Sequence, residues 1–329
     1  MLTWTDAHRI ANIAAAQAHR DLDVDPGAPP IDVEMALAAA DVPLMWRPMP
    51  RLFGAYLNSA DSRPGVLVNS AIPVGARRHT AAHELGHHRL RHSATIEDGA
   101  CLHLDPLETA IASSAAGRLR WTDQEKSAEA FAAWFLMPRR AVLSAMGTLG
   151  LTRLQTATQI YRLSLILGTS YRSTVRHLPN LRIASQERSR SWLAEAPGRI
   201  KAQLDPTRTW QGRGTADLWT IDQRFNGSRV RLQHGDQLVA VANRNEDLAV
   251  TGDACLAELT PVSGADGITW RSWLATDALQ QVDGIVTITA FHKRVSTSLA
   301  SPLWRVSVVV QAPPLGLSRI GLQPMEPPR

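Results

Sequence analysis

The sequence predicts an α+β fold in which a mainly helical first domain with a small sheet is followed by a helical segment and a C-terminal β-sandwich-like domain. Apolar residues recur at helical spacing in several segments before residue 178. Two short runs of strand character, 52–58 and 66–69, lie among these helices. After residue 216 the pattern changes to short β-type runs separated by turns, which is typical of a β-sandwich.

The composition is that of a globular protein. The length of 329 residues gives room for two domains, and the hydrophobic fraction of 44% is ordinary. No apolar run approaches the roughly 18 residues that a membrane-spanning helix needs. The N-terminus lacks a basic region followed by an apolar core, so no signal peptide is expected. The two cysteines, Cys101 and Cys255, suit structural free thiols. We therefore expect a cytoplasmic protein with no membrane partner.

The positive charge is local. The formal net charge is +5, and eight basic against three acidic residues between 176 and 213 give the same excess, 8 − 3 = +5. Such a stretch can contact nucleic acid or an acidic partner. The alternative interpretation is a solvated helix and linker.

The elements before residue 70 are expected to be two helices, a short strand or turn, and two strands. Their expected bounds are 5–20, 31–40, 43–48, 52–58 and 66–69. A turn at 61–65 separates the last two strands.

The next helix is predicted from Pro73 into the motif His83-Glu84-Leu85-Gly86-His87, since proline is tolerated in a first turn. Residues four apart share a helix face, so His83 and His87 point the same way. Two imidazoles so placed can bind one tetrahedral Zn²⁺. Glu84, beside the metal, can act as general base toward a metal-activated water. With 11 histidines in the chain a chance match is the alternative, and a third ligand is needed.

A second helix within 125–138 can supply that ligand; Thr122 marks its start, and Pro138 lies just past its end. Glu125 completes a two-histidine site that leaves the fourth position to water. Glu129, one turn on, suits a role in holding a ligand histidine by its other ring nitrogen. The alternatives are a capping box formed by Thr122 and Glu125, and a solvated helix charge at Glu129.

The two motifs together resemble the ImmA/IrrE family of metallopeptidases over roughly residues 5–185. The second motif is Glu125-x-x-Ala128-Glu129-x-Phe131-Ala132-Ala133-x-Phe135-Leu136-Met137-Pro138. The resemblance implies that Glu125 is the third zinc ligand with His83 and His87. The sequence departs from the family at Glu129, where Asn or Asp is usual, and at His79, where an aromatic residue is usual.

The resemblance also implies a function. Members of this family are zinc-dependent endopeptidases that cleave a helix-turn-helix transcriptional repressor in a stress response or in the control of a mobile element. A protein substrate of this kind and Zn²⁺ are therefore the expected partner and cofactor. By analogy with zinc peptidases, an exposed edge strand of the small sheet could hold the substrate peptide.

Other polar residues have weaker assignments. His79 lies one turn before His83 and either lines the site or is structural. His79, His88 and Tyr161 are candidates for stabilising the oxyanion. His92 and His103 are expected to be surface or packing residues.

Three more helices are expected at 139–147, 154–167 and 171–178. The last two flank Gly168-Thr169-Ser170, which gives the outline of a helix-turn-helix. Arg172, Arg176 and His177 are candidates for reading DNA bases. The alternative, which the family resemblance favours, is that this pair packs against the catalytic helices.

The remainder is expected to be a helix at 189–204, a linker at 205–214, and the β-rich domain. The expected β runs are 230–232, 238–241, 248–250, 285–289 and 304–310. The predicted domains are a peptidase domain (1–150), a helical segment (151–205), a β-rich sensing or partner-binding domain (215–315) and a Pro-rich tail (316–329).

Two rival functions stay open. One is a DNA-associated regulator in which the metal is structural and the basic segment binds DNA. The other is a scaffold that sequesters a repressor without cutting it.

Overall fold

The computed structural model describes residues 1–59, 62–92, 95–98, 121–210, 215–264, 266–276, 283–293, 301–318 and 320. The chain mixes helices and sheets, as predicted for an α+β protein. It divides into two compact units. Unit 1 comprises Met1–Ser144, Leu167–Ser173 and Pro314–Arg329, and unit 2 comprises Ala145–Ile166 and Thr174–Pro313. The predicted domain boundaries at 150, 205 and 215 stay predictions.

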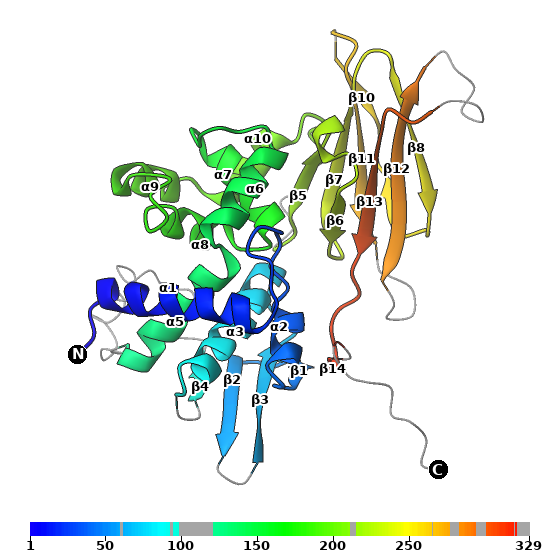
Figure 1. Ribbon diagram of the computed structural model, residues 1–329. Coiled ribbons are helices and arrows are strands. Elements are labelled where there is room, and N and C mark those ends of the chain that lie inside the picture. Colours follow the sequence, from blue (N-terminus) through cyan, green and yellow to red (C-terminus); the bar gives the residue numbers. More distant parts are fainter. Residues whose placement is uncertain are drawn as a thin grey trace, which may run out of the picture. The chain divides into compact units, whose positions relative to one another are not determined.

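Unit 1 contains a five-stranded sheet with the order β14-β1-β3-β2-β4 (Figure 1). The strands are β1 (Leu44–Arg47), β2 (Leu52–Ser59), β3 (Ser62–Asn69), β4 (Thr95–Asp98) and β14 (Gly316–Leu317). β1 and β3 pair in parallel and the other neighbours are antiparallel. The two strands predicted at 52–58 and 66–69 are therefore confirmed, but the turn predicted at 61–65 is wrong over residues 62–65, which belong to β3 and pair with β2.

Two segments of this sheet were not expected. The mixed pattern of residues 94–107 predicts a loop or covering segment, but Thr95–Asp98 pair with β2; residues 94 and 99–107 lie outside the described part. Gly316 and Leu317, in the predicted Pro-rich tail, pair with β1. β4 and β14 carry too little strand pattern of their own to be predicted, because pairing with a partner distant in the chain determines them.

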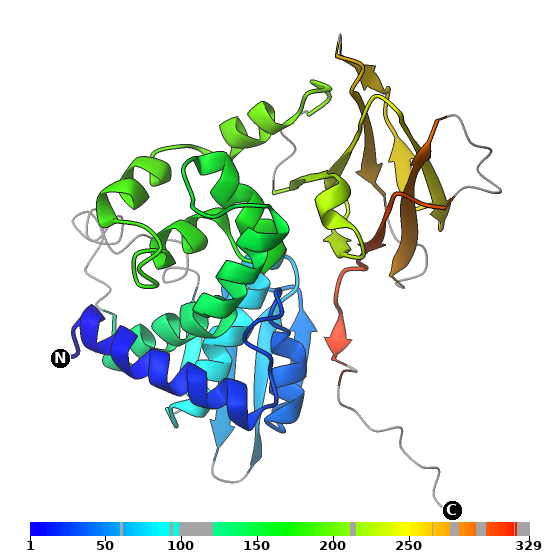
Figure 2. The ribbon, with the colours of Figure 1, turned by 45° about the horizontal axis from the view of Figure 1, so that its top comes forward.

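The helices of unit 1 include three that pack side by side, α1 (Trp4–Asp21), α3 (Val74–Arg89) and α5 (Asp123–Leu136). Ala7, Ala11, Ala15 and Ala18 are buried on one face of α1, and these small side chains let α1 approach α5 closely. α3 packs on both β2 and β3 (Figure 2). The motif from His83 to His87 on α3 therefore lies between the sheet and α5.

The other α-helices of the described residues follow the predicted order with one correction. They are α2 (Val33–Ala39), α6 (Arg139–Thr148), α7 (Ala157–Leu167), α8 (Tyr171–His177), α9 (Gln186–Leu193) and α10 (Pro197–Leu204). The single helix predicted over 189–204 is wrong, since Pro197 starts a new helix there. Proline disfavours helical backbone at the residue before it, and Ala196 is extended with ψ 132°.

Unit 2 contains two sheets, with the orders β10-β11-β7-β5 and β6-β13-β12-β8; β9 also pairs with β11. Their strands are β5 (Leu218–Ile221), β6 (Arg229–Leu232), β7 (Gln237–Ala242), β8 (Glu246–Gly252), β9 (Leu256–Glu258), β10 (Val262–Ser263), β11 (Thr269–Ala275), β12 (Gly284–His292) and β13 (Trp304–Val310). All five predicted β runs fall in these strands. Alternate residues of β13 are buried, as expected when one face of a sheet lies in a core.

The helical part of unit 2 is joined to its first strand by polar contacts. The Tyr161 hydroxyl donates to Asp217 Oδ1 at 2.9 Å and accepts from the Leu218 amide at 2.9 Å. Lys201 Nζ lies 3.1 Å from the same carboxylate. These contacts fix α7 and α10 to β5.

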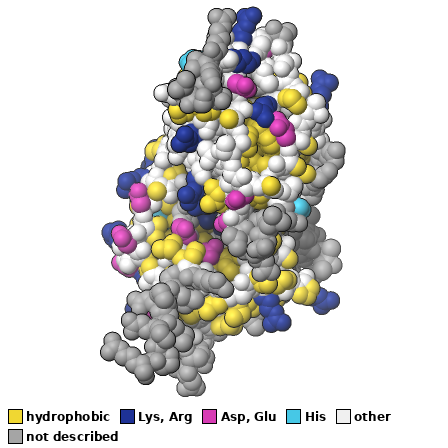
Figure 3. Space-filling model, turned by 90° about the vertical axis from the view of Figure 1, so that its right-hand side faces the viewer, with side chains coloured by type: hydrophobic (Ala, Val, Ile, Leu, Met, Phe, Trp, Pro, Cys, Tyr) yellow, Lys and Arg dark blue, Asp and Glu magenta, His cyan; other side chains and the backbone are white. Residues whose placement is uncertain are grey.

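None of the described helices is both long and apolar enough to cross a membrane. On one face of the molecule, hydrophobic side chains are interspersed with charged ones (Figure 3). The large hydrophobic side chains that are exposed include Met35, Met45 and Leu317 of unit 1.

Candidate metal centre

The centre is built on α3. His83 and His87 lie one turn apart on this helix, and both are completely buried. Their Nε2 atoms are 2.9 Å apart, and their ring centroids are 4.8 Å apart. The two rings therefore face one point, as their spacing predicts.

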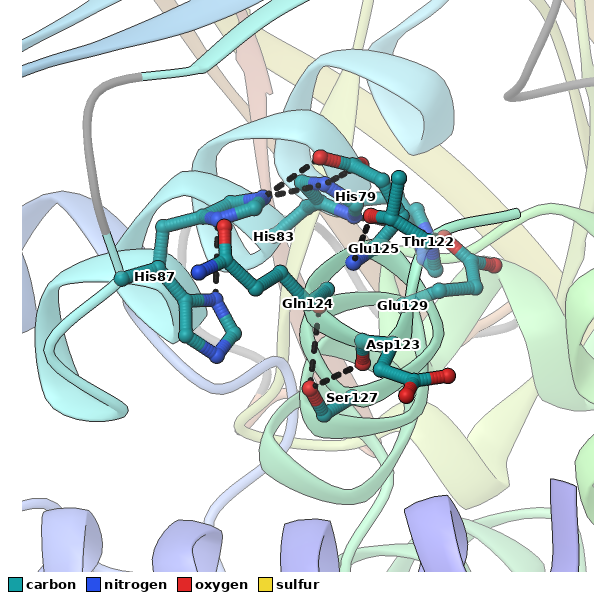
Figure 4. Close-up of polar contacts among 10 residues, drawn as sticks. His79, His83, His87, Thr122, Asp123, Gln124, Glu125, Ser127 and Glu129 are labelled. Atoms are coloured by element: carbon teal, nitrogen blue, oxygen red, sulfur yellow. Dashed lines mark hydrogen bonds and ion pairs between the residues drawn. The ribbon is translucent and has the colours of Figure 1, made fainter. Parts of the chain in front are cut away.

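Glu125 reaches this point from α5. Its Oε2 lies 3.2 Å from His83 Nε2 and its Oε1 lies 3.6 Å from His87 Nε2. One donor atom from each of the three residues lies within 4.8 Å of the others. Figure 4 shows the three side chains converging from the two helices. The sequence places Glu125 roughly forty residues after the histidines, so the packing of α5 on α3 creates the cluster.

The protonation states suit a cation. Burial opposes ionisation of Glu125, but hydrogen bonds and the charges of His83 and His87 hold its pKa well below the usual range. Burial lowers the pKa of His87, which favours its neutral form. Metal ligands must be deprotonated, and two histidines with one carboxylate are a donor set that zinc takes in catalytic sites.

The helix cap at Thr122 involves only the backbone amide of Glu125, not its carboxylate. Thr122 Oγ1 accepts from the Glu125 amide at 3.2 Å, so Thr122 caps α5. The Glu125 carboxylate lies at the two histidines. Capping and the cluster thus use different parts of one residue.

Glu129 lies one turn further along α5. Its Oε2 is 2.8 Å from His79 Nε2 and 3.5 Å from His83 Nδ1. Although burial opposes ionisation here too, the charge of His79 and hydrogen bonds from both histidines hold the pKa of Glu129 well below its usual range. His79 is itself buried, so it lies behind the cluster as the partner of Glu129.

Glu84 is completely buried beside His83. β2 comes very close to it at Gly54. A Cβ atom at that position would lie 2.9 Å from Glu84 Oε1 and 3.0 Å from the Leu67 carbonyl oxygen, and would also collide with Thr80. The strand can approach the carboxylate only because residue 54 has no side chain.

The prediction that His92 is a surface or packing residue missed a direct contact with the cluster. His92 Nδ1 lies 3.0 Å from His87 Nδ1. Burial and the neighbouring His87 lower the pKa of His92 to about 4. His92 follows His87 by five residues, and α3 ends between them. This spacing brings the two rings together only because the chain reverses direction at the end of α3.

The other candidates are placed elsewhere. His88 Nδ1 lies 3.1 Å from the Tyr56 hydroxyl, and Tyr161 uses its hydroxyl for contacts within unit 2. Cys255 is buried and free, in line with a structural thiol. His103 and Cys101 lie outside the described residues.

Of the three residues considered for DNA reading, His177 is buried, Arg176 is half-buried and Arg172 is exposed. His177 is 2% exposed, and its neighbours Thr174 and Val175 on α8 are completely buried. A side chain buried in this way cannot reach a base edge. In the basic segment, Lys201 is buried and bonds to the Ala216 carbonyl.

Residues 51–165 match the family model Peptidase_M78, described as the IrrE N-terminal-like domain. This match covers both motifs and confirms the resemblance to the ImmA/IrrE family over these residues. No curated protein sequence matches the chain.

Two solved structures are similar to parts of the chain. One is the cysteine protease inhibitor EhICP2 of Entamoeba histolytica, with 9% identity, 29% of this chain and 97% of that chain covered, and a TM-score of 0.24. The other is the solution structure of amebosin, with 12% identity, 30% and 100% of the two chains covered, and a TM-score of 0.19.

Proposed function

We propose that the chain, which carries the IrrE N-terminal-like domain of peptidase family M78 in residues 51–165, is a zinc-dependent endopeptidase. The observation that supports this most is the convergence of His83, His87 and Glu125 from two helices on one point. In this proposal these three residues would hold Zn²⁺. Zinc, when bound, supplies a Lewis acid that makes a water molecule far more acidic than in bulk solution.

Glu84 is the proposed general base. It follows His83 on the helix, so its carboxylate lies beside the ligands and not among them. Glu84 takes a proton from the attacking water as the new C–O bond forms at the peptide carbonyl. When the C–N bond breaks, Glu84 passes that proton to the departing amine. The complete burial of this carboxylate keeps bulk water from competing for it.

The proposed substrate is a helix-turn-helix transcriptional repressor, in a stress response or a mobile-element switch. This rests on the resemblance to the ImmA/IrrE family, and the β-rich part of unit 2 is then a sensing or substrate-selecting module. In a cytoplasmic setting such a repressor would be accessible to the peptidase. Among the described residues, β4 is the edge strand on the β2 side of the sheet. An extended segment of substrate could pair with this edge.

The test is the substitution Glu84→Gln in the full-length protein. It keeps the shape of the side chain and removes its basicity, so the variant should bind zinc like the parent and cleave at least about a hundredfold more slowly. The assay combines a zinc competition titration with cleavage of a purified candidate repressor. Undiminished cleavage by the variant would refute the role of Glu84.

A chelator arm separates the proposal from its rivals. Cleavage that stops on zinc removal and returns on zinc addition identifies a metallopeptidase. A complex with the repressor that persists without cleavage would identify the sequestering scaffold. Tight, salt-sensitive DNA binding that Glu84→Gln leaves unchanged, with no cleavage, would identify the DNA-associated regulator.

A further inference from the structure

The end of α3 brings a third histidine, His92, to the group formed by His83, His87 and Glu125. The helix stops in a left-handed turn, where Arg91 has φ 55°. The Arg91 amide donates to the His88 carbonyl at 3.2 Å, and the His92 amide donates to the His87 carbonyl at 2.9 Å. This is the hydrogen-bond pattern of a Schellman motif, which reverses the chain over its own last turn. The backbone therefore ties residue 92 to residue 87.

The side chains of these two residues meet as well. His92 Nδ1 lies 3.0 Å from His87 Nδ1. The planes of the two rings meet at 71°, and the ring centroids are 5.0 Å apart. Two ring nitrogens at hydrogen-bond distance must share one proton, so one donates and the other accepts. His87 Nε2 faces His83 and Glu125. If that atom binds the metal, the proton of neutral His87 must be on Nδ1.

We infer that His92 is a positioning residue, whose Nδ1 accepts a hydrogen bond from His87 and so fixes the tautomer and ring orientation in which His87 binds metal. The inference rests on the proposed metal site. His92 Nδ1 is then unprotonated, and its own proton is on Nε2. The partner of a ligand histidine fixes which of its nitrogens is available to the metal, and losing such a partner typically weakens binding.

The two ligand histidines are held by different chemistry. His83 Nδ1 faces the carboxylate of Glu129 at 3.5 Å, whereas His87 Nδ1 faces an uncharged ring at 3.0 Å. A carboxylate partner makes a ligand imidazole more electron-rich, but a neutral acceptor orients it with little added charge. His92 therefore contributes orientation without adding a further negative charge to a cluster that already contains Glu125 and Glu129.

The experiment compares two substitutions of His92 that differ in hydrogen bonding. Asparagine in His92→Asn places an acceptor oxygen near the position of Nδ1, whereas leucine in His92→Leu fills the space without an acceptor. The matched control is His19→Gln, which also removes a buried histidine from unit 1 but lies away from the cluster, at the Phe135 carbonyl. Zinc dissociation constants are measured on full-length proteins by competition with a chromophoric chelator.

His92→Leu should weaken zinc binding about 10- to 100-fold. His92→Asn should recover most of the affinity, and His19→Gln should bind like the parent. Equal affinity of the leucine variant and the parent would overturn the inference. Equal weakening by leucine and asparagine would also overturn it, since that would indicate a packing role. If the parent itself binds no zinc, the proposed function fails, which is a separate outcome.

A second readout needs no substitution. Selective ¹⁵N labelling of histidine in the zinc-loaded parent shows which ring nitrogens carry protons. The expected pattern is a protonated Nδ1 on His87 and an unprotonated Nδ1 on His92. A proton on His92 Nδ1 would overturn the inference even if His92→Leu fails to fold.

Discussion

Glu129 Oε2 lies 2.8 Å from His79 Nε2, and this contact holds the Glu129 carboxylate in place. The same oxygen lies 3.5 Å from Nδ1 of His83, a proposed zinc ligand. Glu129→Gln removes the negative charge and keeps the shape. We expect zinc binding to weaken about tenfold, because His83 then loses an anionic partner on Nδ1. A competition titration measures this. The carboxylate would have no such role if the dissociation constant stayed at the parental value while thermal unfolding showed an intact fold.

Gly54 determines how closely β2 can lie to Glu84. A Cβ at this position would be 2.9 Å from Glu84 Oε1 and 3.0 Å from the Leu67 carbonyl. Gly54→Ala should therefore lower the free energy of unfolding by about 1–3 kcal/mol and reduce cleavage by displacing Glu84. The matched control on the neighbouring strand is Gly65→Ala, whose Cβ would meet nothing closer than 3.8 Å. Urea unfolding and the cleavage assay give both readouts; similar losses in the two variants would contradict this account.

Gly86 allows α3 and α5 to come into contact. A Cβ there would lie 2.9 Å from Cδ1 of Phe131 on α5. Gly86→Ala should thus lower stability and, by pushing α5 away, weaken zinc binding through Glu125. Gly147→Ala in α6 meets nothing within 4 Å and should stabilise the protein by about 0.5–1 kcal/mol, the usual gain from alanine in a helix. Unfolding curves of both variants measure the contrast, and a stabilised Gly86→Ala would show that the helices can separate without cost.

His19 predicts a pH dependence of stability. Burial lowers its pKa, while its Nε2 lies 2.9 Å from the Phe135 carbonyl. Below the unfolded pKa of about 6.5 the unfolded chain binds a proton that folded His19 resists, so stability falls as pH decreases from there toward the folded pKa. His19→Gln should remove this contribution and flatten the pH dependence. Urea unfolding at several pH values between 5 and 8, with chelator present to remove metal effects, compares the two proteins. The same pH dependence of stability in the parent and in His19→Gln would contradict this role of His19.

Local sequence signals predicted much of unit 1. α5 starts after Thr122 because the Thr122 hydroxyl caps the helix, and α3 starts after Pro73, which lies at its N-cap, where a missing amide costs nothing. The interval from His83 to His87 specifies a shared helix face directly. The arrival of Glu125 at that face could be predicted through the family resemblance, but its physical cause is tertiary packing.

Features that depend on distant or reversed chain segments could not be predicted in this way. His92 meets His87 because Arg91, a residue without special preference for left-handed backbone, adopts φ 55°. β4 exists because β2 offers it an edge, and its four residues carry no strand pattern of their own. The break at Pro197, in contrast, follows from the local chemistry of proline, which disfavours helical backbone at Ala196 although the apolar spacing continues across it.

The pairing of β14 with β1 affects how the protein can be synthesised. Met45 pairs with Leu317, and Ser318 Oγ donates to Glu34 Oε2 across 284 positions of the chain. Closing so long a loop is slow relative to local folding, and a nascent chain emerges N-terminus first. The sheet on which α3 packs therefore acquires β14 only after residue 317 has left the ribosome. Until then the outer edge of β1 is open to pairing with other chains, and stalled or truncated products are expected to aggregate through it.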